Sequence, residues 1–375
     1  FASGLWIGGK VNDDLRVVVA EYSFEYKPGP ILPDGTPANS EDDRYRVYKI
    51  NRGDGPENPD YAQWPVEDGA PVNADGTPQV LGDQTVWTVY NDGDEGGHSN
   101  MQTKPLGLEV QQTTFAFNRT GPLGNVIFVK FKVINKGGNQ IDSTYVSLWS
   151  DPDLGQFDND LVGADVDKSL GFCYNSTNTD AVYGAAPPAV GYDFFQGPIG
   201  DEGTELPMTS FNKYINGTDP HTAQEVFNYM KGVDPDGGVA DHTDPTTGAV
   251  TAYVVAGDPV AGTGWLDSNP ADRRYMLSSG PFTFAPGDTQ EVVAAIIVAQ
   301  GKDRLTSITA LRFFDASAQA AFDSDFQLPS PPPAPKVTVS TLGSYDGNGK
   351  VVLTWDDRSE IGDDGGYPFE GYNVY

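Results

Sequence analysis

The sequence predicts a mainly β protein: a large antiparallel, jelly-roll-like β-sandwich with long loop insertions and one or two short helices, followed by part of a second, smaller β domain. Three observations support this fold class. Apolar and polar residues alternate over 125–134, where Ile127, Val129 and Phe131 share one face, as in a half-buried antiparallel strand. The 44 Gly and 29 Pro among 375 residues indicate many turns between short strands. A Pro-rich run at 329–335 separates two regions of different composition.

Segments rich in β-branched and aromatic residues, bounded by turn residues, predict the strands of the sandwich. The first two form a hairpin, and 289–299 is apolar almost throughout, which predicts a strand buried on both faces. A long excursion at 27–83, rich in Pro, Gly, Asp and Asn, holds one short predicted strand at 44–50. The other expected strands are 3–10, 14–22, 84–90, 107–117, 125–134, 140–149, 189–196 and 281–285.

Two helices are expected. The first spans 219–232, because Asp219 can cap it, Pro220 suits the first helical position and Gly232 can end it. The second spans 302–322, where one stripe carries apolar side chains at helical spacing, namely Leu305, Ile308, Leu311, Ala318 and Phe322. We expect this second helix to pack on the sheet or to close one end of it.

These elements divide the chain into a large β-sandwich module with acidic loops (1–328), a stiff linker (329–335) and the start of another domain (336–375). In that last part, strands expected at 337–340, 351–355 and 369–375 resemble the first strands of an immunoglobulin-like, fibronectin type III domain. Such a sandwich needs about seven strands. We therefore expect the natural protein to continue beyond residue 375.

The net charge of −30 comes from 53 acidic and 23 basic residues. A surface of this sign repels nucleic-acid phosphates and anionic lipid headgroups, which argues against nucleic-acid binding. It attracts divalent cations and also keeps a protein soluble in concentrated salt, so adaptation to a saline habitat is an alternative explanation. No apolar run approaches the roughly 18 residues of a membrane helix, so no membrane insertion is expected.

The stretch 151–175 follows a predicted strand and predicts a loop folded around a calcium ion. Calcium takes six to eight oxygen ligands, which closely spaced carboxylates and loop carbonyls can supply. The spacing differs from the helix–loop–helix calcium motif, and a solvated acidic loop is the alternative. The candidate ligands are Asp151, Asp153, Asp158, Asp160, Asp165 and Asp167.

The sequence carries no local catalytic signature: no zinc-protease His pair, no nucleophile elbow and no phosphate-binding Gly-rich loop. Because carboxylates are so abundant, close acidic pairs give no evidence of a hydrolase. Aromatic side chains in loop-like stretches can stack on sugar rings, and Trp64 and Trp265 are the candidates for such ligand binding. Anchoring of the long loops by buried rings is the alternative for both.

Four stretches resemble a class of large modular secreted bacterial proteins, in which a β-rich module precedes fibronectin type III-like domains and a C-terminal sorting domain of the type IX secretion pathway. They are YVSLWSDPDLGQFDNDLVGADVDKSLGFCYN (145–175), PPAVGYDFFQGP (187–198), SSGPFTFAPGDTQEVVAAIIVAQGKDRL (278–305) and ASAQAAFDSDFQLP (316–329). The resemblance implies an extracellular or cell-surface location and a modular build rather than a particular activity.

We therefore expect a non-enzymatic extracellular structural or adhesive protein, stabilised by calcium, on the cell surface or in an extracellular filament or sheath. Its expected partners are other copies of itself or other surface proteins, since sheet edges offer pairing sites for assembly. The alternative is a carbohydrate-binding or accessory module of a secreted hydrolase, with a polysaccharide as ligand.

Overall fold

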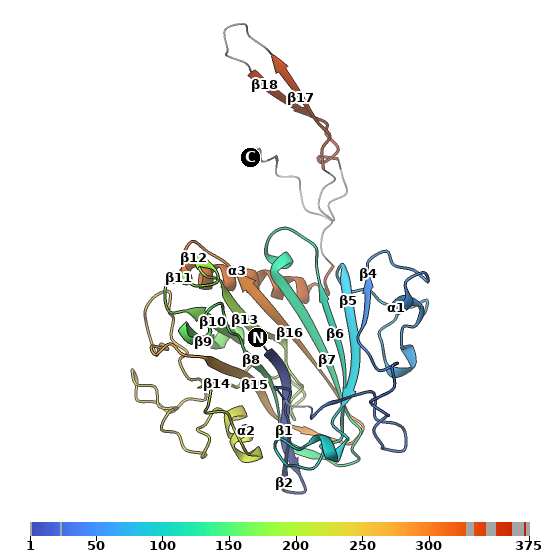
Figure 1. Ribbon diagram of the computed structural model, residues 1–375, viewed down its shortest axis with the longest axis vertical. Helices are drawn as coiled ribbons and strands as arrows, with labels where there is room; N and C mark the ends of the chain where they lie inside the picture. The colour runs from blue at the N-terminus through green and yellow to red at the C-terminus, as the bar shows by residue number, and fades with distance from the viewer. Residues whose placement is uncertain (1, 23–24, 328–333, 343–349, 362–370, 373–375) are drawn as a thin grey trace. The chain divides into compact units, whose positions relative to one another are not determined.

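The computed structural model describes residues 2–22, 25–327, 334–342, 350–361 and 371–372. It is mainly β, and its two principal sheets are antiparallel throughout (Figure 1). The chain divides into two compact units, residues 1–319 and 320–375, and each is described by itself. The predicted mainly β, antiparallel sandwich is confirmed in the first unit.

A five-stranded sheet forms one layer of the first unit. Its central strand β8 pairs with β15 on one side and with β1 on the other. The sheet therefore joins segments from the beginning, the middle and the end of the unit. Its order is β14 (Ser210–Ile215), β15 (Arg273–Phe284), β8 (Ile141–Asp151), β1 (Ala2–Val11) and β2 (Asp14–Val18).

A nine-stranded sheet forms the other layer. Its order is β3 (Lys27–Pro28), β5 (Gln84–Asn91), β6 (Leu108–Ala116), β7 (Val126–Asn135), β16 (Thr289–Ala299), β13 (Ala189–Gln196), β10 (Leu170–Asn175) and β9 (Asp160–Asp165). The ninth strand, β4 (Tyr48–Asn51), pairs with β5. A separate two-stranded ribbon joins β11 (Thr179–Asp180) to β12 (Gly184–Ala185).

The main core lies between the two sheets. One cluster of buried apolar side chains takes Leu148 and Leu277 from the five-stranded sheet and Val129 and Val292 from the nine-stranded sheet. On β7 the predicted inward face is correct for Val129 and Phe131, which belong to this cluster, whereas Ile127, predicted on the same face, is 44 % exposed. Period-two alternation therefore placed these side chains on the right face.

Two helices cover the outer faces. Helix α2 (Ala223–Met230) packs on the five-stranded sheet, where Val226 and Met230 join Trp6 and Trp149 in a second buried cluster. Helix α3 (Arg304–Asp323) lies along the nine-stranded sheet (Figure 1). A Cβ at Gly191 of β13 would lie 3.1 Å from Leu311 Cδ2, which shows how closely helix and sheet approach.

The start of α2 differs from the prediction. Thr222, rather than Asp219, caps the helix: its hydroxyl accepts from the Glu225 amide, and the Glu225 carboxylate accepts from the Thr222 amide. This capping box satisfies two exposed amide groups of the first turn at once, whereas a cap at Asp219 satisfies fewer. Asp219 lies instead 4.0 Å from the guanidinium of Arg274.

The stretch 151–175 is also more regular than predicted. Its second half forms the antiparallel hairpin β9–β10 instead of one continuous loop. Strand β14 and the first half of β15 were missed as well. The remaining short elements are α1 (Pro59–Ala62) and five 3-10 turns at Val66–Asp68, Glu95–Gly97, Pro122–Asn125, Phe157–Asn159 and Val166–Lys168.

The second unit contains a hairpin of β17 (Val337–Leu342) and β18 (Lys350–Trp355), in which Val337 pairs with Trp355. Two of the three strands predicted there are thus present. The predicted strand at 369–375 and the linker at 329–335 lie mostly outside the described residues. Among the described residues, no helix combines the length and the apolar character that crossing a bilayer would demand.

Candidate functional site

Three aspartates from two strand ends form an acidic group. Asp151 ends β8, Asp153 follows in the next loop, and Asp272 directly precedes β15. Each carries a carboxylate oxygen that lies within 4.8 Å of the corresponding oxygens of the other two. The pairing of β8 with β15, in which Ser150 faces Tyr275, brings these distant segments together.

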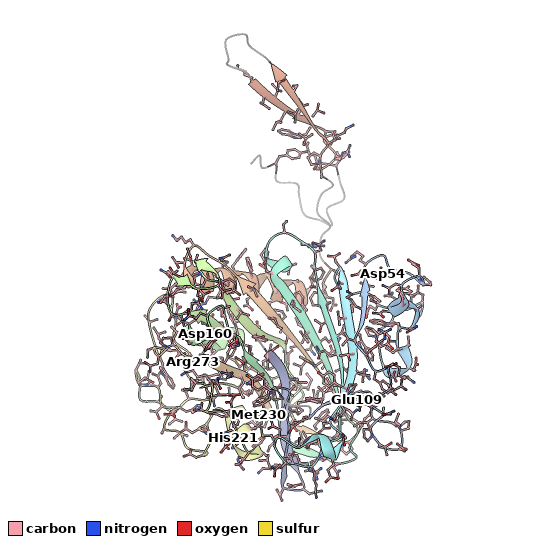
Figure 2. The ribbon with its side chains drawn as sticks, viewed as in Figure 1. Asp54, Glu109, Asp160, His221, Met230 and Arg273 are labelled. Carbon is pink, nitrogen blue, oxygen red and sulfur yellow. The ribbon has the colours of Figure 1, made fainter. Side chains whose placement is uncertain are left out.

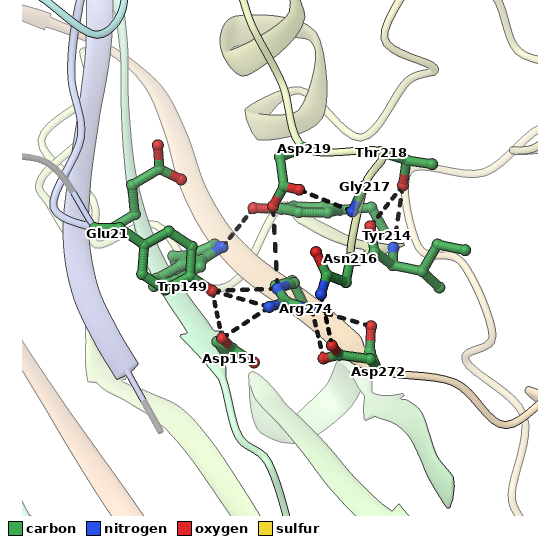
Figure 3. Close-up of polar contacts among 12 residues, drawn as sticks. Glu21, Trp149, Asp151, Tyr214, Asn216, Gly217, Thr218, Asp219, Asp272 and Arg274 are labelled. Carbon is green, nitrogen blue, oxygen red and sulfur yellow. Dashed lines mark hydrogen bonds and ion pairs between the residues drawn. The ribbon is translucent and has the colours of Figure 1, made fainter. Parts of the chain in front are cut away.

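The guanidinium of Arg274 occupies the middle of this acidic group. Figure 3 shows it between Asp151, Asp219 and Asp272, with dashed lines to all three. Its Nη2 lies 3.1 Å from Asp151 Oδ2, and its Nε donates to the Tyr22 hydroxyl at 3.2 Å. Three carboxylates, those of Asp151, Asp219 and Asp272, thus lie within 4.0 Å of one guanidinium, and Asp153 adds a further charge beside Asp151 and Asp272, so an excess of negative charge remains.

Asp151 is the buried member of the group. Its side chain is 1 % exposed, and one carboxylate oxygen, Oδ2, accepts hydrogen bonds from Tyr22 and Arg274. The other oxygen, Oδ1, is buried and has no hydrogen-bond partner among the described residues. Burial raises the pKa of this carboxyl above its ordinary value. An unpaired buried oxygen of this kind is costly unless a further ligand satisfies it.

The other four predicted calcium ligands lie outside this group. Asp158 and Asp167 are exposed, and Asp165 forms an ion pair with Arg312 at 2.7 Å. Asp160, labelled in Figure 2, is buried and accepts from the Leu154 amide at 3.1 Å. Burial raises its pKa to about 7. The structure thus joins two of the six predicted aspartates to Asp272.

Sequence reasoning missed Asp272, Arg274, Asp219 and Tyr22. They are far from Asp151 in the chain, and no local spacing links them to the acidic stretch. The pairing of β15 with β8 brings Asp272 and Arg274 to Asp151. The order of strands in a sheet cannot be predicted from alternation of apolar and polar residues.

The two predicted ligand-binding tryptophans lie in different environments. Trp64 is 6 % exposed, contacts Trp87 and Tyr48, and donates its indole N–H to the Pro71 carbonyl at 2.9 Å. It therefore anchors the long excursion, and little of its ring is exposed. Trp265 is half-buried and packs against the main core.

Trp265 lines a cavity of about 400 Å³, called the Trp265 pocket below. Its walls come from β14, from the end of α2, from the loop after α2 and from the segment that contains Trp265. The polar side chains that line it are Asn212, Lys213, Tyr229, Asp234, Asp241, His242 and Thr243.

A pair of buried carboxyl groups joins α3 to the nine-stranded sheet. Asp193 of β13 and Asp315 of α3 are 1 % and 2 % exposed, and their carboxyl groups interact with each other. Burial raises the pKa of both carboxyls, and the proximity of Asp315 raises that of Asp193 further. Lys168 Nζ, 3.5 Å from Asp315 Oδ2, offsets part of the charge.

This carboxyl pair predicts a loss of stability as the pH rises. A carboxyl whose pKa is higher in the folded than in the unfolded chain binds more protons when folded, so the free energy of unfolding falls above the unfolded pKa of about 4. Asp193→Asn, which stays neutral, should raise the free energy of unfolding at pH 8 by roughly 1–3 kcal/mol and have less effect at pH 5. Chemical unfolding at both pH values measures this.

The matched control for this pair is Asp167→Asn, at an exposed position close to Lys168 in the chain. It should leave the pH dependence of unfolding unchanged. An Asp193→Asn protein with the same pH dependence as the parent would show that the pair remains protonated, or remains compensated by Lys168, throughout this range.

Comparison with solved structures finds distant likenesses. No protein-family model matches the chain, and no curated protein matches it. A GH36 α-galactosidase from Geobacillus stearothermophilus, solved in complex with stachyose, is similar over 70 % of this chain and 28 % of its own, with 11 % identity and a TM-score of 0.28. For a GH92 inverting mannosidase from Bacteroides thetaiotaomicron the shares are 64 % and 26 %, with 8 % identity and a TM-score of 0.23.

The chain thus spans little more than a quarter of each of these two enzymes. Likenesses with such low TM-scores do not indicate a shared fold or a shared activity.

Proposed function

We propose that this chain is a non-enzymatic, calcium-stabilised structural or adhesive module of an extracellular protein, located on the cell surface or in a filament or sheath. The observation that carries the proposal is the acidic group at Asp151, in which a buried carboxylate oxygen has no hydrogen-bond partner in the described part of the chain. The β-rich fold, the net charge of −30 and the sequence resemblance to modular secreted proteins are consistent with it.

Calcium suits this group better than a transition metal does. The ligands on offer are carboxylate oxygens, which hard cations prefer, and neither His nor Cys belongs to the group. Asp151, Asp153 and Asp272 would supply three of the six to eight oxygens, and carbonyls or water would supply the others. A bound cation would tie the end of β8 to the start of β15, and it would offset the excess negative charge around Arg274.

Calcium should therefore raise the stability of the protein. At a calcium concentration 100 times its Kd, the free energy of unfolding should rise by about 2.7 kcal/mol, which corresponds to several degrees in Tm. Asp153→Asn should remove most of this rise, because it takes one ligand charge from the group without opening the core. Thermal unfolding with calcium and with chelator measures both effects.

Asp158→Asn is the matched control, since Asp158 lies in the same acidic stretch but outside the group. It should keep the full calcium response. A parent protein whose Tm is the same in calcium and in chelator would contradict the calcium proposal. Adaptation to a saline habitat would then be the explanation of the acidic composition. Sedimentation in the same calcium buffer tests assembly, and a monomer at high concentration would exclude the filament version.

A carbohydrate-binding or accessory module is the second candidate function. The specific observation in its favour is Trp265, a half-buried ring beside a cavity whose other walls carry mixed donors and acceptors. Small-molecule sites typically combine an apolar surface with a few convergent polar groups. This function and the structural one are compatible, because the acidic group and the Trp265 pocket have no lining residue in common.

A further inference from the structure

We propose that the Trp265 pocket binds one hexose unit of a neutral glycan, with the indole of Trp265 against a sugar face and with Lys213, Asp234, Asp241 and His242 as polar contacts. The proposal rests on the second candidate function, carbohydrate binding, and gives it a location. It concerns residues that the calcium proposal does not use.

The walls of the pocket are held by the main chain. The amide of Phe211 in β14 donates to Ala252, and the amide of Val254 donates back to Phe211. This pairing fastens the segment before Trp265 along the free edge of the five-stranded sheet. The Trp265 carbonyl accepts from the Gly257 amide at 2.8 Å, which fixes the indole's own backbone. A site whose backbone is fixed in this way loses little entropy when a ligand binds.

His242 gives the strongest evidence that the Trp265 pocket binds a ligand. Its side chain is 2 % exposed and lines the pocket, yet its Nδ1 has no hydrogen-bond partner among the described residues. The other ring nitrogen, Nε2, lies 3.7 Å from Asp234 Oδ1. Burial lowers the pKa of this imidazole, so the ring is neutral near pH 7. A neutral imidazole nitrogen can accept from, or donate to, a sugar hydroxyl.

The charges in the pocket favour a neutral ligand over an anion. Two carboxylates, Asp234 and Asp241, line the pocket with a single cation, Lys213. That cation is partly compensated, because Lys213 Nζ lies 3.3 Å from Asp267 Oδ1, an oxygen that also pairs with Arg273 at 2.8 Å. An anionic ligand would therefore meet two carboxylates and one cation whose charge is partly offset.

The arrangement also disfavours a metal ion. Asp234, Asp241 and His242 are ligand types that metals use, but among the described residues they do not converge as the group at Asp151 does. A polyhydroxylated ligand has no need of such convergence, since each hydroxyl both donates and accepts. The cavity of about 400 Å³ lies within the roughly 300–1,000 Å³ typical of small-molecule sites.

The test is binding of the full chain to neutral glucan, mannan and galactan, with polygalacturonate as the anionic counterpart, by affinity electrophoresis and calorimetry. We expect at least one neutral polymer to bind and the anionic one not to bind. Trp265→Ala should weaken binding roughly tenfold or more, and Trp265→Phe should retain much of it, since a ring face remains. Phe157→Ala, at an exposed aromatic residue elsewhere, is the control and should bind like the parent.

The possible results distinguish the proposed location, the Trp265 pocket, from the proposed function, carbohydrate binding. Because Trp265 packs against the core, Tm is measured for each variant, and His242→Gln gives a second test that leaves the indole in place. If a neutral glycan binds and neither Trp265→Ala nor His242→Gln weakens it, the pocket is not the site, although carbohydrate binding stands. If none of the polymers binds to the parent protein, the location and the function both fail.

Discussion

Arg274→Met is expected to lower the free energy of unfolding by about 3–5 kcal/mol at neutral pH in the absence of calcium. The Arg274 side chain is 8 % exposed and compensates Asp151, which is 1 % exposed, across a distance of 3.1 Å. Methionine fills similar space but leaves Asp151, Asp219 and Asp272 without their cation. Removing one partner of a buried ion pair usually costs this much, because the other charge stays buried and uncompensated.

Urea unfolding measures this loss, since urea, unlike guanidinium, does not screen the charges. Calcium should restore part of the stability of Arg274→Met, because a bound cation replaces some of the missing positive charge. Arg52→Met is the matched control: Arg52 pairs with Asp83 at 2.8 Å, but its side chain is 65 % exposed. An exposed pair contributes at most about 1 kcal/mol. A loss for Arg274→Met no larger than for Arg52→Met would show that Asp151 takes up a proton when Arg274 is removed.

Trp149→Ala is expected to cost a similar 3–5 kcal/mol. Trp149 is fully buried and stacks on Trp6 with ring centroids 5.7 Å apart. Its indole N–H donates to the Tyr214 hydroxyl at 2.7 Å (Figure 3). The ring of Tyr22 contacts the indole edge-on, with centroids 5.4 Å apart. Truncation of a large buried aromatic leaves a cavity that the surrounding strands cannot close.

Chemical unfolding of Trp149→Ala and Trp149→Phe separates the contribution of ring packing from that of the hydrogen bond to Tyr214. The Phe variant keeps part of the ring packing but leaves the hydroxyl of Tyr214 without its donor, so its loss should be smaller, about 1–3 kcal/mol. Phe157→Ala, at a side chain that is 53 % exposed, should change stability by at most about 0.5 kcal/mol. Equal losses for Trp149→Ala and Phe157→Ala would contradict the assignment of Trp149 to a packed cluster.

Alternation in the sequence was enough to predict the fold class and most strands of the nine-stranded sheet. The expected strands at 84–90, 107–117 and 189–196 correspond to β5, β6 and β13 within one residue at each end. These strands bury alternate side chains, or pack on both faces, so local composition carries their signal. Strands β9 and β10 were missed because acidic and glycine residues, which favour turns, stand within and beside them.

Only part of the candidate sites could be found in this way. Asp151 and Asp153 were predicted because they are close in sequence, whereas Asp272 and Arg274 join them through strand pairing. Trp64 and Trp265 are equivalent in sequence terms, since both lie in turn-rich segments. Whether such a ring closes a core or lines a pocket depends on tertiary packing.

The pairing of β1 with β8 has a consequence for how this protein acquires its structure during synthesis. Strand β1 pairs with β8, so Ala2 faces Asp151, and β8 needs β15 on its other side. Each pairing closes a loop of more than a hundred residues, and such non-local contacts make folding slow. The five-stranded sheet cannot be completed until residue 284 has left the ribosome. Until then, the edge of β8 that pairs with β15 remains open, and a chaperone that holds extended segments would bind there.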